Sequence, residues 1–377
     1  MSSTFISLLA IMLLRPLRLS FRGTCATNFI NKTAPYVRHK SSSANLPADL
    51  ILPDELDRID SHRYCVSHVR RFDRENYLAA LFIKDKLTRR AVFCLRAFNV
   101  ELALVKDLTS DLQRAKLRFH FWSKLIDEIA RKYKEGDINI VKEKAYYKQT
   151  PIAKELLDVF HLVDIKGDIE EQLRNLIGAR ISSKIIGDEP LETMGDLELY
   201  CLKSNASIYR LAHRLSTGLH NMFPENLYVT EVNDRISDEL GLAHGISNVI
   251  RGIPHNATMR CCYIPKDLLS EHRLAREDFM IVDKVKERPK LDGARIAPVV
   301  KALSQRCQSL LDSVRADQRH ITAYFRDLYL PRVAIQSYLK RLRKCDYNVC
   351  DPRLGVRNGL LPLSMKLATV HHRLPVL

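Results

Sequence analysis

The chain has 377 residues, 46% of them hydrophobic, and a net charge of +16. This length is enough to bury a large core, and the scarcity of glycine (13 residues) favours helices over a turn-rich β fold. Residues 1–48 contribute six Lys or Arg and no acid, which leaves +10 for residues 49–377. That excess is either a solvated basic surface or attraction to an anionic partner such as phospholipid. Nucleic acid is not expected as a partner, because zinc-finger spacings and aromatic RNA-binding motifs are absent.

The cysteines and the short catalytic motifs exclude several classes of enzyme. The nine cysteines are odd in number and form no CxxC pair, which indicates reduced thiols rather than disulfides. Cys345 and Cys350 lack a second metal-like pair, so we expect neither zinc nor a cofactor. The absence of GxSxG, GxGxxG and P-loop patterns argues against serine hydrolases, dinucleotide enzymes and P-loop nucleotide hydrolases.

Residues 1–48 are basic, rich in Ser and Thr and free of acids, as is typical of a mitochondrial transit peptide. A secretory signal places its charges before the apolar run, whereas Arg15, Arg18 and Arg22 follow the apolar residues 5–14. Ten residues are also too few to span a bilayer as a helix. We therefore expect a disordered transit segment at 1–48 and one domain at 53–377.

Apolar residues at helical spacing predict a series of helices in that domain. The first covers residues 62–83, and Thr88 is expected to cap the second, which runs to about Asp107. Pro254 should end another helix near Arg251, because proline breaks helix interiors. Further helices are expected at residues 111–136, 150–163, 168–186, 197–218, 231–251, 293–319, 321–343, with a kink or break at Pro331, and 360–370. Without a strand pattern of any length, the expected fold is one all-α domain of about ten helices.

Several short segments, in this order and spacing, resemble the squalene/phytoene synthase family. They are Lys86–Arg96, Pro190–Thr193 leading to Leu197–Tyr200 and Ala206, Gly241–Ala243 leading to Asn248–Arg251, and Arg260–Pro265 followed by Asp267 and Leu268. The resemblance covers residues 62–377 and implies the all-α isoprenoid-synthase fold.

Active members of that family join prenyl diphosphates and hold Mg²⁺ between two aspartate-rich helix faces. Carboxylates four residues apart share a helix face, and oxygen ligands on two facing helices suit Mg²⁺. The resemblance places the first aspartate pair at Asn99 and Ala103 and the second at Gly252 and Asn256. None of these four residues is acidic, so the resemblance implies a site without its metal ligands and without the family's catalysis.

Neighbouring residues do not restore the carboxylates, although part of the anion-binding frame is retained. Glu101 lies two residues from both Asn99 and Ala103, about 200° round the helix, so it cannot replace either one. Asp107 lies on the same helix face as Asn99 and Ala103, but no second acid accompanies it. The resemblance implies that Arg96, Asn248 and Arg251 match positions that contact diphosphate or its metal. They could hold an anion or a lipid headgroup, or the two arginines could pair with acids such as Glu101 or Asp107.

A narrower resemblance rests on three segments of the chain. They are Arg96–Ala103 followed by Val105–Asp107, His244–Asp267, and the tail from Asp346 through Pro352 with Asn358–Leu363. These segments resemble the mitochondrial assembly factors of respiratory complex I (NADH:ubiquinone oxidoreductase) that carry a squalene/phytoene synthase-like domain. That family also lacks the aspartate pairs. The resemblance implies a matrix protein, peripheral to the inner membrane, that supports biogenesis of a membrane-arm subunit.

The sequence therefore favours a non-catalytic assembly factor whose partners are a complex I subunit or assembly intermediate and the inner-membrane lipid surface. Its basic face would meet anionic lipid, and a hydrophobic client or lipid would occupy the old substrate cavity. Two alternatives stay open. One is a prenyl transferase in which Asp107, Glu101, Asp127 or Glu128 restores metal binding. The other is a lipid-binding module without a dedicated client.

Overall fold

The computed structural model describes residues 60–109, 111–135, 150–162, 167–182, 189–220, 227–280, 291–317, 320–321 and 325–370. The predicted transit segment and the first residues of the predicted domain lie outside these ranges. Throughout the described ranges the regular structure is helical and no strand occurs, which confirms the all-α prediction. None of the helices in this part of the chain combines the length and hydropathy needed to cross a bilayer.

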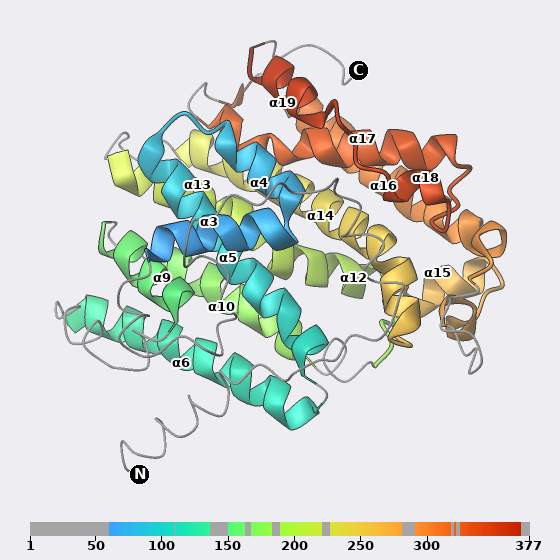
Figure 1. Ribbon diagram of the computed structural model, residues 1–377, viewed down its shortest axis with the longest axis horizontal. Helices are drawn as coiled ribbons and strands as arrows, with labels where there is room; N and C mark the ends of the chain where they lie inside the picture. Colours follow the sequence, from blue (N-terminus) through green and yellow to red (C-terminus); the bar gives the residue numbers. More distant parts are fainter. Residues whose placement is uncertain are drawn as a thin grey trace, which may run out of the picture.

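The helices keep the labels of Figure 1. The first group is α3 (Ser61–Phe72), α4 (Arg74–Leu81), α5 (Lys86–Leu108), α6 (Leu112–Glu135), α9 (Pro151–His161) and α10 (Gly167–Ile181). The second is α12 (Met194–Cys201), the π-helix η3 (Leu202–Ala206), α13 (Ser207–His220), α14 (Leu227–Thr258), α15 (Lys266–Glu271) and the 3₁₀ turn η4 (Arg276–Phe279). The last is α16 (Gly293–Asp317), the 3₁₀ turn η6 (Arg326–Tyr329), α17 (Pro331–Lys344), α18 (Pro352–Gly355) and α19 (Leu361–Val370).

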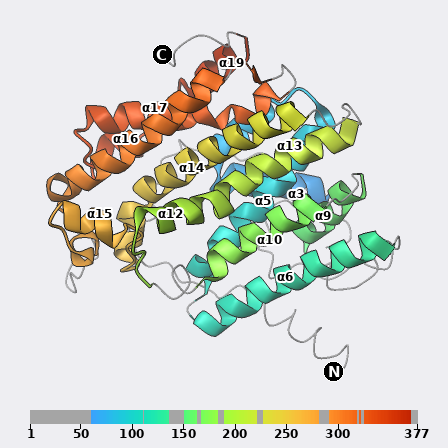
Figure 2. The same ribbon diagram turned by 180° about the vertical axis from the view of Figure 1, so that it is seen from behind.

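The helices form two packed layers. One layer runs from α6 through α10, α13 and α14 to α16, each helix packing on the next (Figure 2). The other contains α3, α5 and α9, and α5 packs on α13 of the first layer (Figure 1). This arrangement puts α5 and α14, which carry the predicted site residues, at the centre of the molecule.

Two glycines of α14 allow η3 and the end of α12 to approach its backbone closely. A Cβ atom at Gly241 would lie 2.3 Å from the Cα atom of Ala206, and one at Gly245 would lie 2.5 Å from the Sγ atom of Cys201. Real Cβ atoms do not come this close to other heavy atoms, so both positions require glycine or a shift of η3. The contact holds the irregular turn of η3 beside α14.

The first and second predicted helices differ from the structure at their ends. The helix expected over 62–83 is two helices, because Asp73 leaves the helical region with φ −137° and ψ 63°. Asp85, rather than Thr88, caps α5, and its carboxylate accepts a hydrogen bond from the Thr88 backbone nitrogen at 2.6 Å. The cap is therefore a full turn earlier than expected, as the preference of helix N-termini for Asp allows.

Of the two predicted proline effects, the helix end at Pro254 was wrong and the break at Pro331 was confirmed. α14 continues through Pro254 to Thr258, and Ile253 and Ala257 of the same segment are buried, so tertiary packing holds the segment helical. Pro331 is the first residue of α17 rather than a kink within it, and the preceding residues form the 3₁₀ turn η6. Proline is favoured at a helix start because its missing N–H has no partner there in any case.

Candidate functional site

Side chains near the C-terminal end of α5 contact α14 and the segment that follows it. The Nζ atom of Lys106 on α5 donates to the hydroxyl of Tyr263, which follows α14, at 2.7 Å. The Oδ1 atom of Asp107 lies 3.6 Å from the Nε2 atom of His255 on α14. These contacts bracket the region in which the sequence predicted a former metal site.

Asn99 meets a cation instead of a metal. Its Oδ1 atom accepts a hydrogen bond from the guanidinium of Arg180, on α10, at 2.6 Å. Arg180 is only 8% exposed, and its other terminal nitrogen donates to the carbonyl oxygen of Leu176 at 2.8 Å. Among the described residues no carboxylate forms an ion pair with Arg180. Burial lowers the pKa of Arg180, although a guanidinium stays charged near neutral pH.

Of the other three predicted positions, only Asn256 has a polar side chain, which is an amide. Ala103 is exposed on α5 and has no polar side chain. Gly252 likewise offers no ligand, and the nearest side-chain atom to a Cβ built there is the amide nitrogen of Asn256, at 3.0 Å. No group of three or more His, Cys, Asp or Glu that could hold a metal occurs in the described part of the chain. These residues do not fit Mg²⁺, because hard divalent cations need several oxygen ligands and the Asn99 oxygen already binds Arg180.

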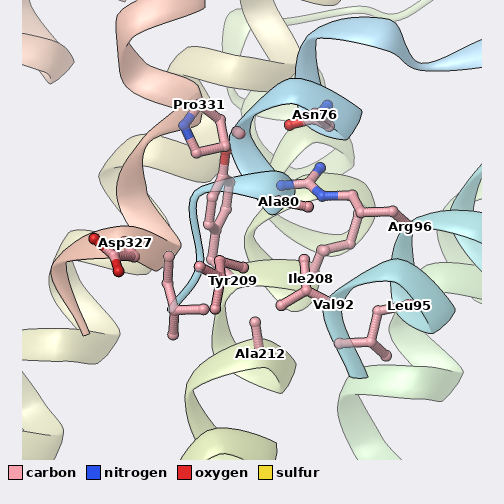
Figure 3. A pocket seen from close by; sticks show the side chains of 13 residues that line it. Asn76, Ala80, Val92, Leu95, Arg96, Ile208, Tyr209, Ala212, Asp327 and Pro331 are labelled. Atoms are coloured by element: carbon pink, nitrogen blue, oxygen red, sulfur yellow. The ribbon is translucent and has the colours of Figure 1, made fainter. Parts of the chain in front are cut away.

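Arg96 lies in a set of polar residues that we call the buried cluster: Asp73, Asn76, Arg96, Tyr209 and His244. Its guanidinium lies over the Tyr209 ring, 5.1 Å from the centroid, and extends toward Asn76 (Figure 3). The Tyr209 hydroxyl is 2.7 Å from the Nδ1 atom of His244, and His244 Nε2 is 3.5 Å from the Asn76 amide nitrogen. That nitrogen donates to both carboxylate oxygens of Asp73 at 2.8 Å. Helices α5, α13 and α14 are thereby joined to the α3–α4 corner.

The electrostatics of the buried cluster favour a structural role. Burial raises the pKa of Asp73, and the charge of Arg96 opposes that rise. Burial, reinforced by Arg96 and Arg251, lowers the pKa of His244 well below its usual value, so the imidazole is neutral. The adjoining cavity has a volume of about 20 Å³ (Figure 3), which is room for one water molecule but not for a headgroup.

The two other predicted anion-binding residues lie in different surroundings. Arg251 forms an ion pair with Glu75 of α4, rather than with Glu101 or Asp107, and lies 4.3 Å from the ring centroid of Tyr338. Asn248 is exposed, and its amide nitrogen is 3.5 Å from the amide oxygen of Asn205 in η3. The three residues thus have different partners, and the charges of the two arginines face nearby acids.

Glu101 and Asp107 do not form a new metal site. Glu101 points to the other side of α5, where its carboxylate lies 3.9 Å from both His68 and Arg118. Asp107 is exposed beside His255. The two carboxylates therefore have different neighbours, as expected from their positions on different sides of α5.

The structure assembles a second polar group that sequence reasoning missed, and we call it the rim cluster: Asn99, Lys106, Arg180, Tyr200 and Tyr263. Burial raises the pKa of Tyr200, and the nearby charges of Arg180 and Lys106 lower it. Burial also raises the pKa of Tyr263 to about 12, opposed by Lys106. Tyr200 lies two residues before η3, and π-helical turns are common at functional sites. The rim cluster therefore gathers two cations and three neutral polar groups, a composition suited to an anion.

Only part of the rim cluster could have been found in the sequence. Tyr200 and Tyr263 lie within the segments that carried the family resemblance, so their proximity to the site was accessible. Arg180 lies on α10 with no motif around it, and its contact with Asn99 joins residues 81 positions apart. No local pattern predicts such a pairing.

Comparison with known proteins agrees with this architecture. The family model for squalene/phytoene synthase matches residues 69–364. A solved dehydrosqualene synthase in complex with ligand has a TM-score of 0.61 at 15% identity, covering 85% of this chain and 98% of that one. A squalene synthase from Alicyclobacillus acidocaldarius has a TM-score of 0.55 at 19% identity, covering 79% and 97%. These two structures share the fold.

Curated relatives match over most of their own length. A Bos taurus protein named "NADH dehydrogenase (ubiquinone) complex I, assembly factor 6" is 25% identical over 95% of this chain and 96% of the relative. The Drosophila melanogaster homolog of that factor is 28% identical over 80% of each chain. Because the family model covers well over half of the residues, the chain belongs to the squalene/phytoene synthase family.

Proposed function

We propose that this protein is a non-catalytic assembly factor for mitochondrial respiratory complex I. It would act at the matrix face of the inner membrane and support biogenesis of a membrane-arm subunit, with a complex I subunit or assembly intermediate as its partner. The observation that carries the proposal is the similarity, over nearly the full length of both chains, to the bovine protein named complex I assembly factor 6. The basic, acid-free residues 1–48 support import into mitochondria.

The chemistry of the α5–α14 region supports the non-catalytic part of the proposal. Prenyl transfer of the family type needs Mg²⁺ to draw off diphosphate as an anion, and Mg²⁺ needs carboxylates. In our proposal Asn99, Ala103, Gly252 and Asn256 occupy the positions of those carboxylates. The Arg180 guanidinium bonded to Asn99 would repel a divalent cation, so gain of a single acid nearby would not restore the site.

Complex I assembly in cells tests the main proposal. Cells that lack the protein should lose assembled complex I on native gels while the other respiratory complexes persist, and expression of the full chain should restore it. Normal complex I in such cells would contradict the proposal. Incubation of the purified chain with farnesyl diphosphate and Mg²⁺ tests the non-catalytic part, and prenyl-transfer product above background would overturn it.

A lipid- or anion-binding module is the second candidate, and the rim cluster is the observation that favours it. A buried guanidinium whose acceptors are an amide and a backbone carbonyl keeps an uncompensated positive charge. Desolvated positive charge of this kind attracts phosphate-bearing groups more strongly than an arginine already paired to a carboxylate. Phosphate-dependent protection of the folded chain, lost when Arg180 is replaced, would support this candidate.

A further inference from the structure

The C-terminal helices present apolar side chains to solvent to an unusual degree. The four most exposed large hydrophobic side chains of the described residues are Val356, Leu360, Leu363 and Val370, which are between 55% and 69% exposed. The next most exposed, on α12, reaches 51%. Single exposed apolar residues need no explanation, but a group confined to one short segment indicates an interaction surface.

α19 is apolar on two opposite faces. Leu361 and Met365 are buried against α17 and α4, together with Val333 and Ala79. The outward side of the same helix carries Leu363 and Val370 where an ordinary surface helix has polar residues. The inward face of α19 packs in the hydrophobic core, so only the outward face can contact a partner.

The same part of the chain is strongly basic. Residues 331–370 contain eight Lys or Arg and two Asp, a net charge of +6. One of the acids, Asp351, is paired with Arg353 at 2.7 Å. Five of the cations are exposed and form no ion pair with any described residue: Lys340, Arg343, Lys344, Arg357 and Lys366. Their charge is therefore available to an anionic surface.

The loop that carries two of the exposed apolar residues is held firmly to α17. The guanidinium of Arg341 donates to the carbonyl oxygens of Leu354 at 3.0 Å and Val356 at 2.7 Å. The Asn358 amide donates to the Ser337 hydroxyl at 2.8 Å, and its oxygen accepts from the Leu360 backbone nitrogen at 3.0 Å. Val356 and Leu360 are therefore presented by a built surface and not by a frayed end.

We propose that this surface, formed by α17, α18, the 356–360 loop and α19 and here called the C-terminal face, rests on an anionic phospholipid bilayer. Val356, Leu360 and Leu363 would enter the acyl boundary while the surrounding lysines and arginines contact headgroup phosphates. The helices α17, α18 and α19 lie together toward one edge of the molecule (Figure 1). The inference deepens the membrane location in the proposed function by assigning the contacting surface.

The composition of the C-terminal face favours lipid over a protein partner. Protein interfaces are enriched in aromatic residues and depleted in lysine. Here the exposed apolar side chains are all aliphatic, and three of the five unpaired cations are lysines. Exposed aliphatic side chains and unpaired cations in the same part of the chain complement a surface of acyl chains and phosphates.

Vesicle co-sedimentation of the full chain tests the proposal. We expect wild-type chain to bind vesicles containing anionic phospholipid, to bind phosphatidylcholine vesicles far less, and to lose part of its binding at high salt. Replacing Lys340, Lys344 and Lys366 by Gln should weaken binding about 100-fold and reduce its salt dependence. The pair Leu360→Glu and Leu363→Glu should weaken binding at least about tenfold even at low salt, since carboxylates enter the acyl boundary poorly.

Helix α6, at the opposite edge of the molecule (Figure 1), provides matched controls. It carries exposed cations such as Arg114 and Lys116, but its exposed leucines, Leu112 and Leu117, reach only 42%. Arg114→Gln with Lys116→Gln, and Leu117→Glu, should leave vesicle binding within about twofold of wild type, as expected for charges beyond the Debye length from the bilayer. Unchanged melting temperatures would show that each variant is folded.

Three results would overturn the proposal. They are equal binding of wild type to anionic and neutral vesicles, C-terminal-face variants that bind like wild type, and greater loss in the α6 variants. If the C-terminal-face variants lost a co-purifying protein but still bound vesicles like wild type, the C-terminal face would be a protein interface instead. Complex I on native gels reports separately on the proposed function: normal complex I without the protein refutes that function, whereas the vesicle results decide the surface.

Discussion

The two polar clusters of the molecule differ in the groups that their buried arginines contact. In the buried cluster, Arg96 faces the carboxylate of Asp73 and the ring of Tyr209. In the rim cluster, Arg180 donates to an amide oxygen and to a backbone carbonyl. The difference shows that a cation near the predicted site is not by itself a binding residue. A cation neutralised by an acid contributes to folding, whereas one that meets only neutral acceptors keeps the capacity to attract an anion.

The largest expected effect comes from removing the cation of the buried cluster. Arg96→Met should lower the free energy of unfolding by about 3 kcal/mol, because it leaves the Asp73 carboxylate buried without its cation. Urea unfolding followed by the fluorescence of Trp122, the single tryptophan, measures the change. Arg96→Lys is the matched control and should lose less. If Arg96→Met were as stable as wild type, the two clusters would not differ in the way described.

The pH dependence of stability should come next in size. The folded-state pKa of His244 lies below its unfolded value. As the pH falls past about 6.5, the unfolded chain therefore binds a proton at this residue that the folded chain does not bind. Stability from the neutral imidazole is therefore fully present above that pH and declines as the pH falls toward the folded-state pKa. His68 and His213, whose pKa values burial lowers to about 4, act in the same direction.

The contribution of His244 is the difference in the pH dependence of stability between wild type and His244→Gln. The urea midpoint of wild type should fall between pH 7.5 and pH 5, and the midpoint of the variant should fall less over the same range. Parallel curves for the two proteins would show that His244 titrates normally in the fold, and would remove the electrostatic basis of the buried cluster.

Local sequence pattern accounts for most of the helices but for few of the side-chain partners. Helical periodicity depends on neighbours three and four positions apart, so the α5 and α14 segments were predictable, as was their meeting through the family resemblance. The Arg251–Glu75 pair spans 176 positions and the Arg180–Asn99 pair spans 81. Such pairs depend on how helices pack, which a propensity scale does not contain. The continuation of α14 through Pro254 has the same origin, because buried neighbours outweigh the local cost of proline.

Replacing the cation of the rim cluster should cost little stability. Arg180→Met should change the free energy of unfolding by less than about 1 kcal/mol in either direction, since an apolar side chain of similar length replaces a buried charge that lacks an acid. Added inorganic pyrophosphate, with a chelator present, should raise the melting temperature of wild type but not of this variant. Arg174→Met, at an exposed arginine of the same helix that pairs with Asp127 and Glu170, is the control and should keep the pyrophosphate response. A large loss of stability in Arg180→Met would place Arg180 in the same class as Arg96.

The smallest expected effect is at His255, eleven positions after His244 on α14. The hydrogen bond and charge of Asp107 raise the pKa of His255, opposed by partial burial. This pair therefore adds stability that is fully present below the unfolded pKa and is lost as the pH rises through the folded one, the reverse of His244. Both side chains are about half exposed, so Asp107→Asn should cost only a few tenths of a kcal/mol at pH 6.

The sharper measurement is a titration of the His255 ring protons by NMR. Asp107→Asn should lower the pKa of His255, whereas Glu101→Gln, a matched change on the other side of α5 beside His68, should leave it unchanged. An unaltered His255 pKa in Asp107→Asn would mean that the ends of α5 and α14 do not meet as described. A shift confined to Asp107→Asn would establish that one helix carries two histidines that respond to acid in opposite directions, because one end lies in the core and the other beside an exposed carboxylate.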